Sequence, residues 1–466
     1  MNNFIVLFAC LIPSKKLRHK FRKYLKYLQY KKENIENFTK YKKILKKFEI
    51  IHCNKNFDKN SPKILHYSTY NIQCGIATFL NDFIKGFENN GFGNNDIIPI
   101  NHDIRKNVLL YLDYLNLLIQ NSKNYDYIIL QHEYGLYNCN YYFSSFEHNI
   151  IQNFLEKIDL DKNLNYESTL ISSLIFTDYI ITNLLGQNKK VSIIWHTTFQ
   201  VAIKDLVANN VELNFKKFPV FRYFDNKNLK IFVMTNDMLN ALKKYKIPVD
   251  NVNFMEHPIP TKKFDISKDK VNSIKQNYDI KENDIILGQF GFVGYSKGNI
   301  NILKAMKHLP QNFKYIMVGG KHQSDNSDYY DNILKYIKDN NLEKRVFITG
   351  FIKEEDVVSY LSIVNLATYV YNTDVNFASG SINQMFLYNI PVLASNGISF
   401  ADLKNHYDCL EITNNSEQPE KLAEDIQNLL KNNDRIDMLR KNMQKFCEDN
   451  TFKNFTNKLL GVINNE

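Results

Sequence analysis

From residue 61 onward, short apolar segments rich in Ile, Val and Tyr alternate with longer stretches of helical periodicity. This alternation is typical of parallel sheets, because their strands are covered on both faces and read as continuous apolar runs. The first series predicts strands at 63–67, 96–100, 125–131, 191–196, 230–235 and 253–256. After a proline pair at 258 and 260 the alternation begins again. The second series predicts strands at 285–290, 314–318, 346–349, 366–371, 391–395 and 409–413.

The two series predict an α/β fold of two doubly wound, Rossmann-like domains. With 466 residues, of which 44% are hydrophobic, the chain can bury two cores and is too apolar to be disordered. We expect the domains at 61–260 and 261–430, followed at 431–466 by helices that pack back on the first domain. Ligands of such sheets bind beyond the carboxyl ends of the strands, so we expect a cleft between the domains.

Positive charge is concentrated before the first predicted strand. Residues 1–60 contain 16 Lys and Arg against 4 Asp and Glu, whereas the whole chain has a formal net charge of +10. The apolar run at 4–12 is far shorter than the ~20 residues that span a bilayer. No basic residue precedes this run, so we expect no secretory signal. At 14–48, apolar residues recur at helical spacing among Lys and Arg.

These features predict a basic, amphipathic amino-terminal arm at 1–60 that lies on an anionic membrane surface. A solvated basic helix packed on the body of the protein is the alternative. The charge is accompanied by no recognised nucleic-acid-binding motif, and we expect no nucleic-acid partner.

Neither the cysteines nor the carboxylates predict a metal centre. The six cysteines are far apart and form no C-x-x-C pair, so they fit neither a zinc site nor a disulfide scaffold. A reducing cytoplasm is the compartment that such cysteines indicate. The D-x-D at Asp159 to Asp161 lies in a polar helical segment rather than at a strand end, and we interpret it as surface.

Short motifs at the ends of the predicted strands occur in the order of one enzyme family. The first domain contains HYSTYNIQCGIATF at 66–79, QHEYG at 131–135 and WHTT at 195–198. The second contains GFVGYSKG at 291–298, VGG at 318–320, TG at 349–350, SG at 379–380 and PV at 391–392. Together these motifs resemble those of the retaining nucleotide-sugar glycosyltransferases of the GT-B fold, especially family 4, over about residues 63–430. The resemblance implies that the first domain binds the acceptor and the second binds the nucleotide sugar.

The loop after the first strand of the second domain contains Gly291, Gly294 and Lys297. Small residues let backbone amides approach a ligand closely and one Lys adds a point charge, which suits a diphosphate without a metal. The loop is neither the G-x-G-x-x-G of dinucleotide-binding proteins nor a Walker A sequence. The resemblance implies that these three residues hold the donor diphosphate, whereas a solvated Lys297 is the alternative.

Ser379 and Gly380 precede an apolar helical run at 382–388, whose first amides would favour a phosphate. In the family, two glutamates with seven residues between them bracket this helix, and Asn376 and Gln384 occupy their positions here. Gln384 can still bond ribose hydroxyls, although a carboxylate would make a bond about twice as strong. All four residues are therefore expected to contact the donor.

In the first domain, Gly75 follows a strand and begins a helical stretch. Backbone amides at such a helix start can bind an anion. The alternative is that Gly75 only permits a tight turn from strand to helix. His196 ends a strand at the position where the family carries a histidine beside the donor sugar. His132 and Glu133 follow another strand and could orient an acceptor hydroxyl or take its proton. Structural roles are the alternatives, including helix capping for Glu133. We interpret His257, in the interdomain linker, as structural.

The resemblance implies a retaining hexosyltransferase of bacterial surface polysaccharide or lipooligosaccharide synthesis. Its substrates would be a nucleoside diphosphate sugar and a hydroxyl of a glycan or glycolipid, with no cofactor or metal besides the donor. The expected place is the cytoplasm, at the surface of the inner membrane. Two alternatives remain: a GT-B-like protein that binds sugars or a partner without turnover, and a nucleotide-sugar epimerase. The sequence leaves open the donor base, the sugar, the linkage and the oligomeric state.

Overall fold

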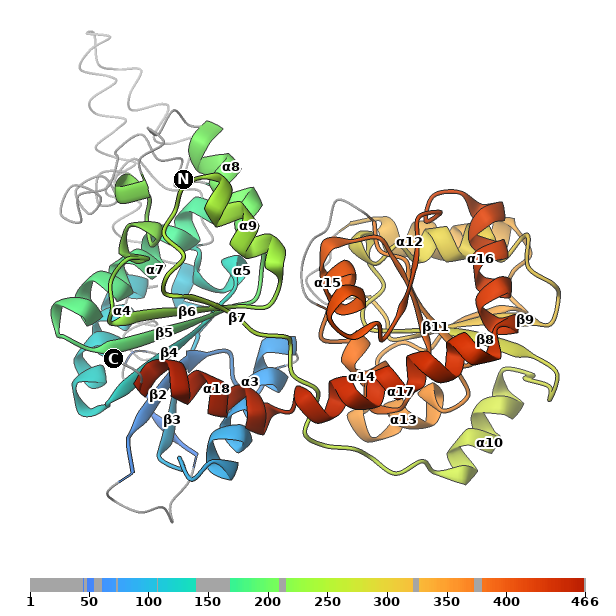
Figure 1. The fold of residues 1–466 in the computed structure, drawn as a ribbon, viewed down its shortest axis with the longest axis horizontal. Coiled ribbons are helices and arrows are strands. Elements are labelled where there is room, and N and C mark those ends of the chain that lie inside the picture. Colours follow the sequence, from blue (N-terminus) through green and yellow to red (C-terminus); the bar gives the residue numbers. More distant parts are fainter. Residues whose placement is uncertain are drawn as a thin grey trace, which may run out of the picture.

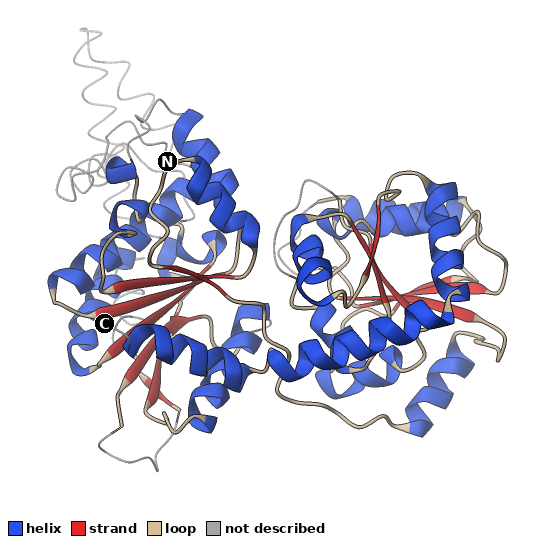
Figure 2. Ribbon diagram, viewed as in Figure 1, coloured by secondary structure: helices blue, strands red, loops and turns tan. Residues whose placement is uncertain are grey.

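The computed structural model describes residues 45, 48–53, 61–72, 74–106, 108–139, 168–208, 215–321, 327–372 and 379–464. Within them the chain forms two α/β domains that lie side by side (Figure 1). Each domain contains one sheet with helices on both faces (Figure 2). The predicted pair of doubly wound domains is therefore confirmed.

The first domain has a seven-stranded sheet in the order β1-β3-β2-β4-β5-β6-β7. Its strands are β1 (Ile51–His52), β2 (Ile64–Ser68), β3 (Asn95–Pro99), β4 (Tyr127–His132), β5 (Lys190–Trp195), β6 (Leu229–Val233) and β7 (Val252–Phe254). Its helices include α3 (Gly75–Asn89), α4 (Val108–Asn121), α5 (Tyr134–Tyr137), α7 (Thr169–Gly186), α8 (Phe199–Ala208) and α9 (Asn236–Lys244). The strand order reverses between β2 and β4, which is the switch point where such sheets bind ligands.

The second domain has a six-stranded parallel sheet in the order β10-β9-β8-β11-β12-β13. Its strands are β8 (Ile285–Phe290), β9 (Phe313–Val318), β10 (Val346–Ile348), β11 (Leu366–Tyr369), β12 (Val392–Ser395) and β13 (Glu411–Thr413). Its helices include α10 (Lys268–Asn277), α11 (Asn299–Ala305), α12 (Tyr329–Asp339), α13 (Glu354–Leu361), α14 (Ile382–Leu387), α15 (Ile398–Tyr407), α16 (Pro419–Lys431) and α17 (Asn433–Asp449). Here the switch point lies between β8 and β11.

All twelve predicted strands are present, within a few residues of their predicted ends. The apolar runs of the inner strands are buried on both faces, and every residue of β2 and of β9 is buried. A strand covered by helices on both sides has no solvent face, which is why these segments lack polar alternation.

The sheet of the first domain begins earlier than we predicted. Ile51 pairs antiparallel with Ile97 of β3, and Leu45, Phe48 and Ile50 pack against the first core. These residues fall in the segment predicted as a separate arm at 1–60, so the end of that segment belongs to the domain. Residues 1–44, which carry the predicted amphipathic helix, lie outside the described residues.

The two carboxyl-terminal helices belong to different domains. Helix α17 packs on α14, α15 and α16 of the second domain, whereas we predicted that the helices of 431–466 pack on the first. Helix α18 (Phe452–Asn464) crosses to the first domain and packs on α3 (Figure 1). A Cβ on Gly86 of α3 would lie 2.6 Å from the Phe452 carbonyl oxygen, so this glycine permits the close helix contact.

Among the described residues, α7 alone has the length and apolar composition of a membrane-spanning helix. Most of its residues are buried inside the first domain, between the sheet and neighbouring helices. The core helix of a globular domain has the same composition, because it is apolar on nearly every side.

Candidate active site

The loops that follow β8 and β11 bring a lysine together with three hydroxyl groups. Lys297 Nζ donates a hydrogen bond to the hydroxyl of Tyr371 at 2.9 Å and lies 4.3 Å from the centre of its ring. The same hydroxyl lies 2.8 Å from Ser379 Oγ and 3.5 Å from Ser381 Oγ. We call these four residues the hydroxyl–lysine cluster. One cation beside several hydroxyl donors, at the switch point of the sheet, is suited to an anion such as a diphosphate.

Glycines let the surrounding loops approach one another without side chains between them. Gly298 has a φ of +61°, and a Cβ there would lie 1.9 Å from the Val370 carbonyl oxygen. Gly319 has a φ of +147°, and its Cβ would lie 2.0 Å from the carbonyl oxygen of Gly291. By contrast, Gly294 has open space where a Cβ would be. The loop geometry therefore requires glycine at 298 and 319, whereas Gly294 leaves space for a ligand.

The predicted helix after Ser379 and Gly380 is α14, which has only six residues. The amide of Ile382 donates to the carbonyl of Ser379, so this first amide is used within the turn. Gln384 is half-buried on α14, and its side chain has no hydrogen-bond partner within the described part of the chain. Asn376 lies outside the described residues.

His196 lies at the carboxyl end of β5, in the first domain. Its Nε2 is 2.8 Å from Oε1 of Gln131, so Nε2 carries the proton that this bond needs. Its ring packs edge-on against Phe79, with 5.0 Å between the ring centres. Burial lowers the pKa of His196 to about 3, so the ring is neutral at neutral pH. A neutral, oriented imidazole at a strand end is compatible with the expected contact to a sugar.

His132 is completely buried at the end of β4. Its ring packs 4.0 Å from the ring of Trp195, and its Nε2 is 3.4 Å from the Ser173 hydroxyl. Burial lowers its pKa to about 3. A side chain enclosed in this way is at odds with the predicted contact to an acceptor hydroxyl, and its position is that of a core residue behind His196.

Glu133 and Gly75 each begin a helix of the first domain. Burial raises the pKa of Glu133, while the backbone at Gly135 and Tyr134 and the charge of Arg105 lower it. The carboxylate thus lies against the first turn of α5, where Glu133 is the N-cap residue, although its side chain makes no capping hydrogen bond of regular geometry. This buried position favours a structural role over proton transfer. Gly75 begins α3 and has open space around its Cβ position, so no steric contact explains this glycine.

The interdomain linker contacts the turn that begins α14. A Cβ on Gly380 would lie 3.0 Å from His257 Nε2. On its other side, the His257 ring packs edge-on against Phe79, with 5.5 Å between ring centres. Phe79 therefore contacts both His196 and His257. Through His257 and Gly380, these contacts connect the strand ends of the first domain to the turn that contains Ser379 and Ser381 of the hydroxyl–lysine cluster.

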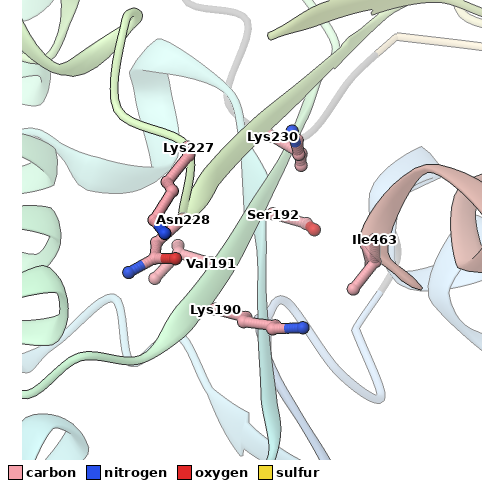
Figure 3. A pocket seen from close by; sticks show the side chains of 7 residues that line it. All are labelled: Lys190, Val191, Ser192, Lys227, Asn228, Lys230 and Ile463. Atoms are coloured by element: carbon pink, nitrogen blue, oxygen red, sulfur yellow. The ribbon is translucent and has the colours of Figure 1, made fainter. Parts of the chain in front are cut away.

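A separate hollow lies at the opposite edge of the first sheet, at the amino ends of β5 and β6 (Figure 3). It is lined by Lys190, Val191, Ser192, Lys227, Asn228, Lys230 and Ile463. Ligands of open α/β sheets bind at the carboxyl ends of the strands, so this hollow is distinct from the candidate site.

Comparison with known proteins agrees with the geometry of the second domain. Residues 270–446 match the family described as glycosyl transferases group 1. The chain therefore carries a glycosyl transferases group 1 domain. The match includes all four residues of the hydroxyl–lysine cluster and ends within α17. Among curated proteins, none matches this sequence.

Solved structures, two of them described as glycosyltransferases, share the two-domain architecture. HepE of Anabaena, in complex with UDP-glucose, is 13% identical, with a TM-score of 0.58 over 86% of this chain and 99% of its own. A glycosyltransferase of Rickettsia africae is 16% identical, with a TM-score of 0.60 over 87% of this chain and 100% of its own. WaaG, a glycosyltransferase involved in lipopolysaccharide biosynthesis, is 11% identical, with a TM-score of 0.56 over 86% and 100%. The fold is GT-B.

The candidate site residues predicted from the sequence did not include Tyr371 or Ser381, and His257 was interpreted as structural. The apolar run at 366–371 predicts Tyr371 as the end of a strand, whereas β11 ends at Tyr369 and Tyr371 lies in the loop at the switch point. Ser381 follows the predicted Ser379 and Gly380 directly. His257 is 123 residues from Gly380 in the sequence, and no local pattern predicts their contact.

Proposed function

We propose that this protein is a retaining glycosyltransferase that moves a hexose from a nucleoside diphosphate sugar to a hydroxyl of a glycan or lipid-linked acceptor. The hydroxyl–lysine cluster carries the proposal, because it places a cation and three hydroxyls at the switch point of a group 1 domain. The donor class is supported by analogy with HepE, which is known in complex with UDP-glucose.

In the proposed reaction, the second domain assists the departure of the nucleoside diphosphate from the sugar. Lys297 stabilises the charge that develops on the leaving group, and the hydroxyls of Tyr371, Ser379 and Ser381 donate to its oxygens. His196 lies on the sugar side as a neutral hydrogen-bonding group. The acceptor attacks from the face that the diphosphate leaves, and a diphosphate oxygen takes the acceptor proton. This route uses no enzymic nucleophile, and we propose that it needs no divalent metal.

The test is acceptor-dependent release of nucleoside diphosphate from a panel of nucleotide sugars, with and without EDTA. Retention of the anomeric configuration in the product, measured by NMR, supports the retaining mechanism. Loss of activity in EDTA contradicts metal independence. Interconversion of the nucleotide sugar without an acceptor indicates an epimerase.

A non-catalytic sugar-binding protein is the second candidate, because Gln384 stands where the family has a glutamate. Binding of the nucleotide sugar with neither release nor interconversion, across a panel of glycan and lipid acceptors, would favour it.

We also propose that residues 1–44 hold the protein on the cytoplasmic face of the inner membrane, within surface polysaccharide or lipooligosaccharide synthesis. They contain 12 Lys and Arg against 2 Asp and Glu, so they account for the whole formal net charge of +10. A deletion must stop at residue 44, because Leu45 and Phe48 pack on the first core. The truncated protein should lose binding to phosphatidylserine vesicles at physiological salt while keeping its affinity for the donor. Unchanged vesicle binding would contradict the membrane role.

A further inference from the structure

The ring of His257 is held in one orientation by the linker and by α14. Its Nδ1 is 2.9 Å from the carbonyl oxygen of Pro258. The amide nitrogen of Asn383, a residue that is 2% exposed, lies 2.9 Å from the His257 carbonyl and 3.0 Å from the Pro258 carbonyl. Asn383 thereby ties the linker to the helix that follows the hydroxyl–lysine cluster.

These contacts determine which nitrogen of His257 carries the proton. The carbonyl oxygen of Pro258 can only accept a hydrogen bond, so its 2.9 Å contact with Nδ1 requires a hydrogen on the ring nitrogen. The amide nitrogen of Asn383, 3.0 Å from Nδ1, has carbonyl acceptors at His257 and Pro258. Nδ1 must then carry a hydrogen and donate it to Pro258. Burial lowers the pKa of His257 to about 4, so the ring is neutral at neutral pH. Nε2 therefore has a free lone pair, and it has no hydrogen-bond partner in the described part of the chain.

This bare nitrogen lies between the two halves of the candidate site. On one side, Nε2 would be 3.0 Å from a Cβ at residue 380, next to the cluster residues Ser379 and Ser381. On the other side, Phe79 separates the ring from His196. His257 and Ser379 also line the same small interdomain cavity, together with Met234 and Asn383.

The chemistry of the nitrogen selects the part of the donor that it can contact. A neutral imidazole nitrogen without a hydrogen accepts hydrogen bonds and cannot donate one. A diphosphate presents acceptors only, whereas a sugar presents several hydroxyl donors. The diphosphate is thus suited to Lys297, and the sugar attached to it is suited to the neighbouring Nε2.

We propose that His257 is a recognition residue for the donor sugar, and that its Nε2 accepts a hydrogen bond from a sugar hydroxyl. This inference rests on the proposed function, because it requires the hydroxyl–lysine cluster to hold the donor diphosphate.

The experiment compares the affinity for a nucleoside diphosphate with that for its hexose derivative, by calorimetry on the full chain. The probes are UDP, GDP, ADP and dTDP, each with one hexose derivative. His257→Phe keeps a ring against Phe79 and removes the acceptor. Gly380→Ala keeps the histidine and fills the space in front of Nε2, so it tests the same contact if His257→Phe fails to fold. His308→Gln is the control, because His308 is an exposed histidine of the second domain, with 38% of its side chain accessible.

We expect either variant to weaken binding of the nucleotide sugar by about 5- to 10-fold, the effect of one neutral hydrogen bond. In His257→Phe, binding of the parent nucleoside diphosphate should stay within about 2-fold of the native value, as should all affinities of His308→Gln. In Gly380→Ala, whose residue lies in the expected phosphate-binding turn, the nucleotide sugar should lose more affinity than the parent nucleoside diphosphate. Equal weakening of both ligands, or of neither, in a folded variant would overturn the sugar contact while leaving the proposed function intact. A native protein that binds none of the probes would instead overturn the proposed function, and this inference with it.

Discussion

A carboxylate oxygen of Asp402 accepts a hydrogen bond from the backbone amide of Asn236 at 2.8 Å, so a residue of the second domain satisfies the first turn of a helix in the first. Beside it, His406 on the second domain lies 2.7 Å from Glu256 at the end of the first. The first contact joins α9 to α15, and the second joins α15 to the segment that follows β7 at the domain boundary.

Asp402→Ala should therefore lower the free energy of unfolding by about 1 kcal/mol, as expected for the loss of a helix-capping carboxylate. Urea denaturation measures the effect. Asp437→Ala is the matched control, because Asp437 is 76% exposed on α17 and should change stability by less than about 0.5 kcal/mol. Equal effects of the two substitutions would mean that the interdomain bond contributes nothing measurable.

Gly298→Ala should destabilise the second domain by more than about 1 kcal/mol, because the residue has a positive φ and its Cβ would collide with the Val370 carbonyl. Gly461→Ala provides the contrast. Gly461 lies within α18 with open space at its Cβ position, so alanine should raise stability by about 0.5–1 kcal/mol. Thermal unfolding of both variants checks the two opposite signs, and a neutral Gly298→Ala would show that the loop can rearrange.

The free energy of unfolding should fall as the pH falls from 6.5 toward 4. Burial lowers the pKa of His66 and His257 to about 4 and that of His132 and His196 to about 3. In the unfolded chain they protonate near pH 6.5, so in this window the unfolded state binds more protons and stability is lost on acidification.

Each histidine contributes a slope of about 1.4 kcal/mol per pH unit, so the four together contribute about 5.5 kcal/mol per pH unit. Burial raises the pKa of Glu133 and of Glu256, so the folded protein binds protons at these two carboxylates more readily than the unfolded chain does. This opposes part of the loss of stability that the histidines cause. Urea titrations between pH 5 and pH 7 measure the slope, and His66→Gln should reduce it by about 1.4 kcal/mol per pH unit. An unchanged slope in that variant would show that His66 does not contribute to the pH dependence of stability.

Lys297→Ala should weaken nucleoside diphosphate binding by about 10-fold or more, because it removes a charged donor. Its stability should stay within about 0.5 kcal/mol of the native value, since Lys297 is only half-buried. Tyr371→Phe removes the hydroxyl that joins the lysine to the serines and should weaken binding by a smaller factor, about 3- to 5-fold. Lys304→Ala, at an exposed lysine of α11, is the control. A destabilised Lys297→Ala variant with native nucleotide affinity would identify the lysine as structural.

Gln384→Glu should tighten donor binding by about 1 kcal/mol, because ribose hydroxyls would then donate to a charged acceptor. Calorimetry with the nucleotide sugar measures the gain. If the native protein binds no nucleotide sugar and the variant does, the non-catalytic alternative becomes the better account. Weaker binding in the variant would mean that the site is built around the amide.

The positions of the twelve predicted strands and the division into two domains followed from the sequence, because both depend on local apolar runs and on the helical periodicity between them. From the resemblance, Gly291, Lys297 and Ser379 were expected to contact one ligand, the donor, and this expectation stays a prediction. Strand β1 was missed, because a strand of two residues has no periodicity to detect.

The tertiary structure decided which of the candidate side chains meet and which are enclosed. Lys297 and Tyr371 are 74 residues apart, and only the pairing of β8 with β11 brings them into contact. His132 and His196 look alike at their strand ends, yet one lies within the core and the other at the domain boundary. His257 and Gly380 approach each other across two domains. Contacts of this kind depend on the folding of distant segments onto one another, and no local pattern of residues encodes them.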